Sequence, residues 1–142
     1  MIRIHSSTKY TAGAALNATA VVYNSTGTTA AACDADDSQA KTSMLRPLGV
    51  LASQVASGEE CDIITYGEAT ALVNGAVSDG DLLVCKDGMG GQVTALTTAI
   101  LNSEFADGDE IYVVGRALEA AATGTACRIF VAPYLISHSE PA

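Results

Sequence analysis

Turn residues interrupt this chain at intervals of roughly 8–12 residues, and the apolar runs between them are short. These runs are rich in Val, Ile and Tyr, which favour strands, and most border a turn that contains Gly. No long segment has the apolar period of a helix; the best helix candidates are 95–101 and 117–122. The spacing predicts a mainly β protein, a small β-barrel, β-tulip-like or sandwich domain with little helix. The predicted strands are Ala20–Tyr23, Cys61–Tyr66 (closed by Gly67), Asp81–Cys85, Ile111–Val114 and Cys127–Val131.

One motif occurs twice. The pattern Gly-x8-Gly-x2-Cys-x-Ile spans residues 49–63 and returns 66 residues later at 115–129. Two copies are too few for a solenoid, so we expect one turn and one strand used twice within a barrel-like core. Glycine at such turns indicates a backbone with positive φ. The repeat therefore predicts that Gly58 and Gly124 occupy equivalent turns in two similar substructures.

The N-terminal segment has a composition of its own. Ile2 and Ile4 alternate with Arg3 and His5, which is a strand pattern with one apolar face. We divide the chain into an N-terminal arm (1–13), a single β-rich domain (14–136) and a polar C-terminal tail (137–142). The arm is predicted to add a strand to a neighbouring subunit; the alternative is that it forms the first strand of the domain's own sheet. The predicted partner-binding residues are Ile2, Arg3, Ile4 and Lys9.

The charge is uneven along the chain. The net charge is −9, and residues 47–142 hold thirteen acids against three cations. No basic patch is present, which argues against nucleic acid as a partner. No run of about 18 apolar residues and no signal-like N-terminus are found, so no membrane partner is expected. Charged residues make up only 16% of the chain, which suits a surface covered by protein partners, including copies of itself.

The cysteines do not form a metal-binding pattern. None are paired as Cys-x-x-Cys, and their spacing matches no zinc site. Three lie in apolar, strand-like contexts, where cysteine acts as a small buried hydrophobe. We predict four free thiols, as in a protein assembled in a reducing cytoplasm: Cys33, Cys61, Cys85 and Cys127.

Sequence motifs for catalysis or cofactors are missing. The only histidines, His5 and His138, lie near the two ends, where placement is least rigid. The acidic stretch 34–37 lies in a polar segment, 34–46, predicted to be an exposed loop, and it fails the EF-hand pattern at the required Gly and Glu. The Gly-rich stretch 88–91 lacks a nucleotide-binding pattern and is expected to be a hairpin loop. We predict no catalytic residue, no metal, no cofactor and no enzymatic activity.

Several segments together resemble the capsid cement, or decoration, proteins of tailed bacteriophages. The most specific is Val114-Gly115-Arg116-Ala117-Leu118-Glu119, which is similar to the family's closing "ValGlyArgAlaLeuGlu" signature. Weaker likenesses occur in the same order along the chain. They are Thr11–Leu16 with Ala20–Tyr23, Pro47–Val50 with Gly58–Ile63, and Gly67 with Val77–Leu83. The cysteines, the polar loop 34–46 and the C-terminal tail depart from the family.

The resemblance implies a β-barrel-like protein that binds the outside of an expanded phage head. Its partner would be the major capsid protein, and it would be a homo-oligomer, with a trimer favoured. Such a protein bridges neighbouring capsomers, resists the pressure of packaged DNA, and is assembled in the bacterial host cytoplasm before it joins the virion. Two alternatives stay open: the base of a head fibre or surface adhesin, and, less favoured, a small barrel enzyme.

Overall fold

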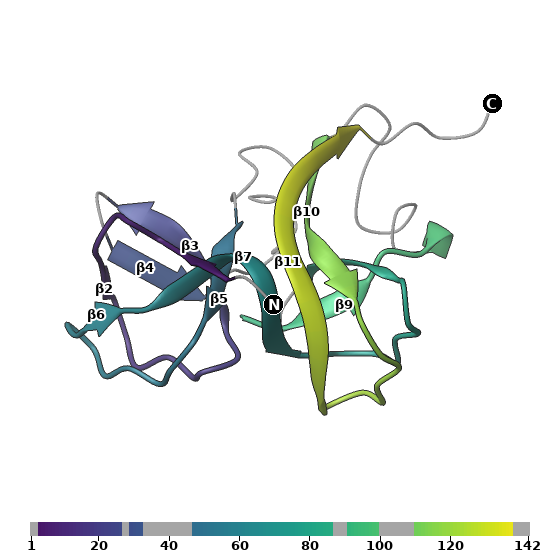
Figure 1. Ribbon diagram of the computed structural model, residues 1–142, viewed down its shortest axis with the longest axis horizontal. Helices are drawn as coiled ribbons and strands as arrows, with labels where there is room; N and C mark the ends of the chain where they lie inside the picture. The colour runs from purple at the N-terminus through teal and green to yellow at the C-terminus, as the bar shows by residue number, and fades with distance from the viewer. Residues whose placement is uncertain (1–2, 27–28, 33–46, 87–90, 100–109, 138–142) are drawn as a thin grey trace.

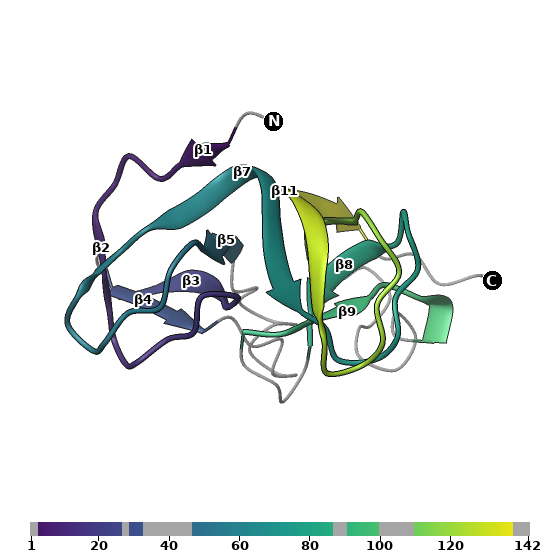
Figure 2. The ribbon, with the colours of Figure 1, turned by 60° about the horizontal axis from the view of Figure 1, so that its bottom comes forward.

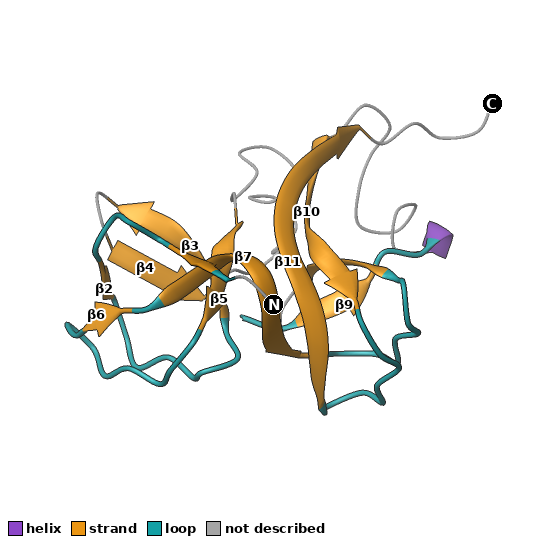
Figure 3. Ribbon diagram, in the orientation of Figure 1, coloured by secondary structure: helices purple, strands orange, loops and turns teal. Residues whose placement is uncertain are grey.

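The computed structural model describes residues 3–26, 29–32, 47–86, 91–99 and 110–137. These residues are almost all strand and turn, with helical geometry only at 98–99 (Figure 3). The predicted mainly β fold is confirmed. The strands are β1 (Ile4–His5), β2 (Tyr10–Ala12), β3 (Val21–Thr26), β4 (Thr29–Ala32), β5 (Pro47–Leu51), β6 (Glu60–Cys61), β7 (Ile63–Leu72), β8 (Leu82–Cys85), β9 (Val93–Ala95), β10 (Glu110–Ala117) and β11 (Ala126–Ser137).

The strands form one continuous sheet that curls into two units side by side (Figure 1). In the first unit, residues 3–66, the pairing runs β2–β4–β3–β5–β7 and returns through β6 to β2. In the second unit, residues 67–137, it runs β7–β11–β10–β8–β9 and returns through the parallel bridge between Val73 and Val93. Each unit is therefore a small barrel-like sheet, and β7 belongs to both.

The two units repeat each other strand for strand. Antiparallel pairing of β3 with β5 in the first unit corresponds to pairing of β8 with β10 in the second. The registers match as well, because Val22 lies opposite Gly49 and Leu83 lies opposite Gly115. The same holds for β4 on β3 and β9 on β8, and for β7 on β5 and β11 on β10. The chain is thus an internal duplication, wider than the motif that the sequence reveals.

The turns at Gly58 and Gly124 are equivalent, as predicted. Their φ angles are +83° and +78°, a conformation that side-chain-bearing residues rarely adopt. The N–H of Gly58 donates to the carbonyl of Ala12 at 2.7 Å, and that of Gly124 donates to the carbonyl of Val73 at 2.8 Å. The two copies lie in separate units, however, and not within the single barrel-like core that the sequence suggested.

Gly67 does not end a strand, contrary to the prediction. It is buried inside β7 with a φ of +110°, and the strand continues to Leu72. Residues 63–64 of β7 pair with β5, whereas residues 67–72 pair with β11. Gly67 therefore lies where the strand bends and passes from the first unit to the second (Figure 2).

Small and β-branched side chains fill the core. The first unit encloses a cluster that includes Leu51, Cys61 and Ile63. A larger cluster inside the second unit includes Ile129 and extends onto the outer face of the first unit at Val50. A smaller third cluster lies under the ends of β8 and β10. Because one cluster spans both units, we expect them to fold together.

The described cysteines fit the sequence prediction. Cys61, Cys85 and Cys127 are free and buried, and Cys33 lies outside the described residues. Burial raises the pKa of the Cys61 thiol, and burial first, then the nearby Glu119 carboxylate, raises that of Cys127. Both shifts disfavour the reactive thiolate.

A thiol-reactivity measurement tests this description. In a Cys33→Ser variant, the three remaining thiols should react with a disulfide reagent far more slowly in the folded protein than in the unfolded protein. The reason is that reaction needs both solvent access and thiolate. Unfolding without reductant should release three reactive thiols. Rapid reaction of the folded protein, or a count below three, would show that these side chains are not free and buried.

Candidate interaction surface

The N-terminal segment lies in the chain's own sheet, as the alternative prediction has it. β1 pairs with β7, with Ile4 opposite Tyr66. The Ser6 N–H donates to the Ile63 carbonyl at 2.8 Å, and the Thr65 hydroxyl donates to the Ile4 carbonyl at 3.1 Å. The Ile4 side chain is nevertheless 52% exposed, although it is apolar.

The other predicted partner-binding residues are also near the surface or outside the described part. Lys9 pairs with Glu60 at 3.1 Å, and both side chains are exposed. Arg3 is exposed and lines a cavity of about 220 Å³ next to the first unit, whereas Ile2 lies outside the described residues. Their binding to a partner stays a prediction.

Histidine and acidic residues do not assemble into a metal or catalytic cluster in the described part. The Nδ1 atom of His5 lies 2.5 Å from a carboxylate oxygen of Asp62, and both side chains are about half exposed. No three His, Cys, Asp or Glu side chains among the described residues gather as metal ligands. His138 and the acidic stretch 34–37 lie outside those residues. The described residues also contain no helix that is long and apolar enough to cross a membrane.

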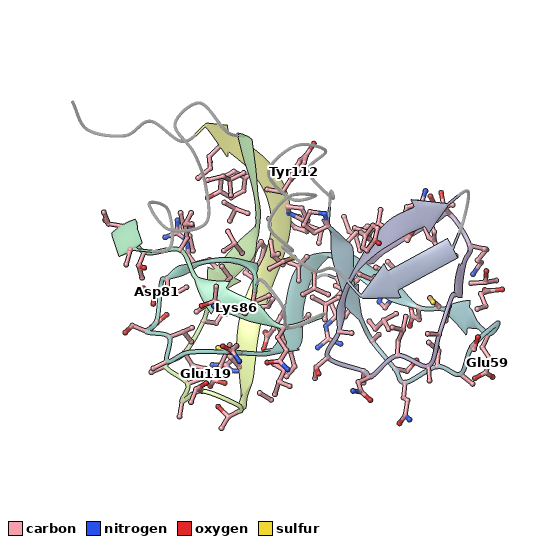
Figure 4. All side chains as sticks on the ribbon, turned by 180° about the vertical axis from the view of Figure 1, so that it is seen from behind. Glu59, Asp81, Lys86, Tyr112 and Glu119 are labelled. Atoms are coloured by element: carbon pink, nitrogen blue, oxygen red, sulfur yellow. The ribbon has the colours of Figure 1, made fainter. Side chains whose placement is uncertain are left out.

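Several acids instead hold turns of the two units. The Glu59 carboxylate accepts the Ala56 N–H at 2.7 Å, and the Asp81 carboxylate accepts the Ser78 N–H at 2.9 Å. Figure 4 shows Glu59 at the outer end of the first unit and Asp81 on the second. Their local hydrogen bonds account for these acids as turn-stabilising residues.

Exposed aromatic side chains gather where β7 and β11 lie side by side. The rings of Tyr66 and Phe130 meet edge to face, with their centroids 5.1 Å apart. Tyr66 is 46% exposed, and Tyr134 further along β11 is 42% exposed. With Ile4 opposite Tyr66, these residues form an apolar strip on the outside of the protein. Tyrosine is common at the energetic centre of protein interfaces.

The strip leads into an open apolar groove on the second unit, which we call the β10–β11 groove. Its volume is about 300 Å³. Arg116 at its edge is exposed and has no ion-pair partner in the described part of the chain. A mostly apolar lining with one unpaired cation suits a protein surface more than a reaction centre. The lining residues are Leu82, Gly115, Arg116, Leu118, Phe130, Ala132 and Tyr134.

Comparison with solved structures finds the same fold in a phage protein. The crystal structure of the N base of the head fibre protein gp8.5 from bacteriophage phi29 is similar to this chain with a TM-score of 0.60. The two chains are 17% identical, and the likeness covers 95% of this chain and 100% of the other. No protein-family model matches the sequence, and no curated protein matches it. At this level of identity the likeness establishes the fold.

An ion cluster lies beside the apolar surface. Arg128 contacts Glu68 at 3.3 Å and Glu119 at 3.4 Å, and its backbone N–H donates to Glu119 at 3.0 Å. The backbone hydrogen bond, followed by the guanidinium hydrogen bond, lowers the pKa of Glu119. Both carboxylates raise the pKa of Arg128, Glu119 the more strongly. The cluster links β7, β11 and the turn that follows β10.

The Glu119 interaction should make stability depend on pH in acid. Because the pKa of Glu119 is lower in the folded state, its contribution is complete above the ordinary value of 4.5 and is lost as the pH falls through the folded value. Glu119→Gln should therefore lower the urea midpoint at neutral pH, and the difference from wild type should shrink in stronger acid. Urea titrations of both proteins at neutral pH and about pH 3 measure this. An equal difference at both pH values would contradict it.

Sequence reasoning did not find the aromatic strip or the groove. Tyr66 and Phe130 are far apart in the sequence, and only the β7–β11 pairing brings them together. One signal was present, because Phe130, Ala132 and Tyr134 alternate along the last predicted strand and its extension. That apolar series on a strand's outward side is the pattern of a surface that binds another protein.

Proposed function

We propose that this chain is a structural protein of a phage head that binds the outer surface of the capsid shell. The observation that carries the proposal is the likeness over nearly the whole chain to a protein described as the base of a phage head fibre. The sequence resemblance to capsid cement proteins, centred on residues 114–119, points to the same place in a virion. The partner would be the major capsid protein.

The chemistry of the surface supports a structural role over a catalytic one. The largest described apolar groove has a single cation at its edge, and the described histidine pairs with an exposed carboxylate. Acids outnumber cations by nine over the whole chain, which suits contact with protein and not with packaged DNA. An exposed apolar strip with two tyrosines suits a docking surface.

Two roles fit this location, and each has its own support. The fold likeness favours the base of a head fibre, which would anchor a projecting structure. The sequence resemblance favours a cement protein, which would bridge capsomers and stabilise the shell. The N-terminal residues Arg3 and Ile4, both exposed, are proposed to take part in contact with the shell in either role.

Binding to expanded heads that lack the chain tests the proposal. The purified protein should sediment with such heads and remain in solution without them. A cement protein should also raise the melting temperature of the heads, whereas a fibre base should bind without raising it. Failure to bind would contradict both roles.

A matched pair of variants tests the proposed N-terminal contact. Ile4→Glu places a charge on a half-exposed side chain and should weaken binding to heads. Ser53→Glu places the same charge on an exposed loop of the same unit and should leave binding unchanged. Equal binding by both variants would remove the N-terminal segment from the contact.

A further inference from the structure

The duplication gives the two units matching outer faces, and only one of these faces is covered. On the first unit, Val21, Val50 and Ile64 are at most 3% exposed, because they join the hydrophobic cluster of the second unit. By the strand correspondence above, their counterparts on the second unit are Leu82, Arg116 and Phe130. These three residues border the open β10–β11 groove.

The covering side is duplicated as well. In the second unit, Val114 and Val131 are fully buried in the cluster that also contains Val50 of the first unit. Their counterparts in the first unit, 66 residues earlier, are Leu48 and Thr65. These two residues are only half buried and line an open cavity of about 290 Å³ with Pro47 and Pro133.

We infer that the β10–β11 groove binds the β5 side of the first unit of a second copy of this chain. The contact would repeat between two chains the packing that joins the two units within one chain. A second copy is the favoured occupant because the surface that covers such a face inside the chain occurs again, uncovered, around Leu48 and Thr65. The contact is heterologous, since different surfaces of the two copies meet.

Charge fits the same arrangement. Val50 in the first unit corresponds to Arg116 in the second, so the matching face differs by one cation at its edge. Arg116 has no ion-pair partner in the described part of the chain, and each further copy brings a net charge of −9. Arginine and tyrosine at an apolar groove are residues that commonly dominate binding energy at interfaces. This inference does not depend on the proposed function, because it concerns the isolated protein.

Sedimentation of the purified protein and of two kinds of variant tests the inference. Wild-type protein should associate with increasing concentration. Arg116→Glu alters the groove, and Leu48→Glu alters the opposite surface; each variant alone should sediment as a monomer of 14.4 kDa. Mixed in equal amounts, they should form a heterodimer, because one intact groove and one intact β5 side remain. Ser53→Arg, on an exposed loop, should associate as wild type does.

Folding is checked by circular dichroism, and Tyr134→Glu and Thr65→Glu replace any variant that does not fold. A wild-type protein that stays monomeric at all concentrations would overturn the inference and leave the groove to another protein. Association that survives both kinds of substitution would also overturn it. Loss of association without recovery in the mixture would show that copies meet through identical surfaces, which contradicts a heterologous contact.

Discussion

Gly115→Ala is expected to destabilise the protein by roughly 3 kcal/mol or more, enough to prevent folding in a domain of ordinary stability. A Cβ atom on Gly115 would lie 2.0 Å from the carbonyl oxygen of Phe130 on the neighbouring strand. Strands β10 and β11 would have to separate, because neither the new methyl group nor the backbone oxygen can turn away. Gly49→Ala should behave alike, since its Cβ would lie 2.0 Å from the carbonyl oxygen of Ile64.

Gly124→Ala is the matched control in the same unit. Gly124 has a φ of +78°, but nothing lies within 4 Å of the position of a new Cβ. The substitution should cost only the strain of a positive φ, about 1–2 kcal/mol. Urea unfolding of the two variants measures the difference. If Gly115→Ala were no more destabilising than Gly124→Ala, the close approach of β10 and β11 would be wrong.

An exchange between Val50 and Arg116 is the second substitution pair with a large expected effect. These residues occupy corresponding positions, but Val50 is fully buried between the units and Arg116 is exposed. Val50→Arg should cost about 3 kcal/mol or more, because it buries an unpaired charge. Arg116→Val should change the stability of the monomer by less than about 0.5 kcal/mol.

Thermal unfolding of dilute protein compares the two variants. Val50→Arg should lower the melting temperature of the whole chain in one transition, because β7 belongs to both units and one cluster spans them. Two separate transitions in wild-type protein would contradict this coupling. Equal tolerance of both substitutions would show that Val50 is not covered by the second unit.

The sequence predicts the strands of this fold well because short β-branched runs between Gly turns admit little else. It also identifies Gly58 and Gly124 as equivalent, because three residue types recur at the same spacing over residues 49–63 and 115–129. Cys61 and Cys127 were expected to be buried, and they occupy corresponding positions in the two cores.

The earlier part of each unit hides the duplication. Val22 and Leu83 correspond in register, but they are 61 residues apart, whereas the glycines are 66 apart. The spacing changes within the unit because the connections between its strands differ in length, and only apolar character links the corresponding residues. A constant-offset comparison therefore detects the second half of the repeat and misses the first.

The candidate surface depends on contacts between distant residues, which no local pattern contains. The sequence placed the interface in the first 13 residues, where the alternation of Ile and Arg is visible. The groove arises from β8, β10 and β11 together, and its openness follows from which unit covers which. Those facts require the pairing of strands, not their identities.

Electron cryomicroscopy of heads with and without this chain tests the proposed function most directly. The difference density should appear on the outer surface of the shell, in contact with the major capsid protein. Each copy should have two lobes of similar size, because the chain consists of two matching units. Absence of added density, or density only inside the shell or at the tail, would contradict the account.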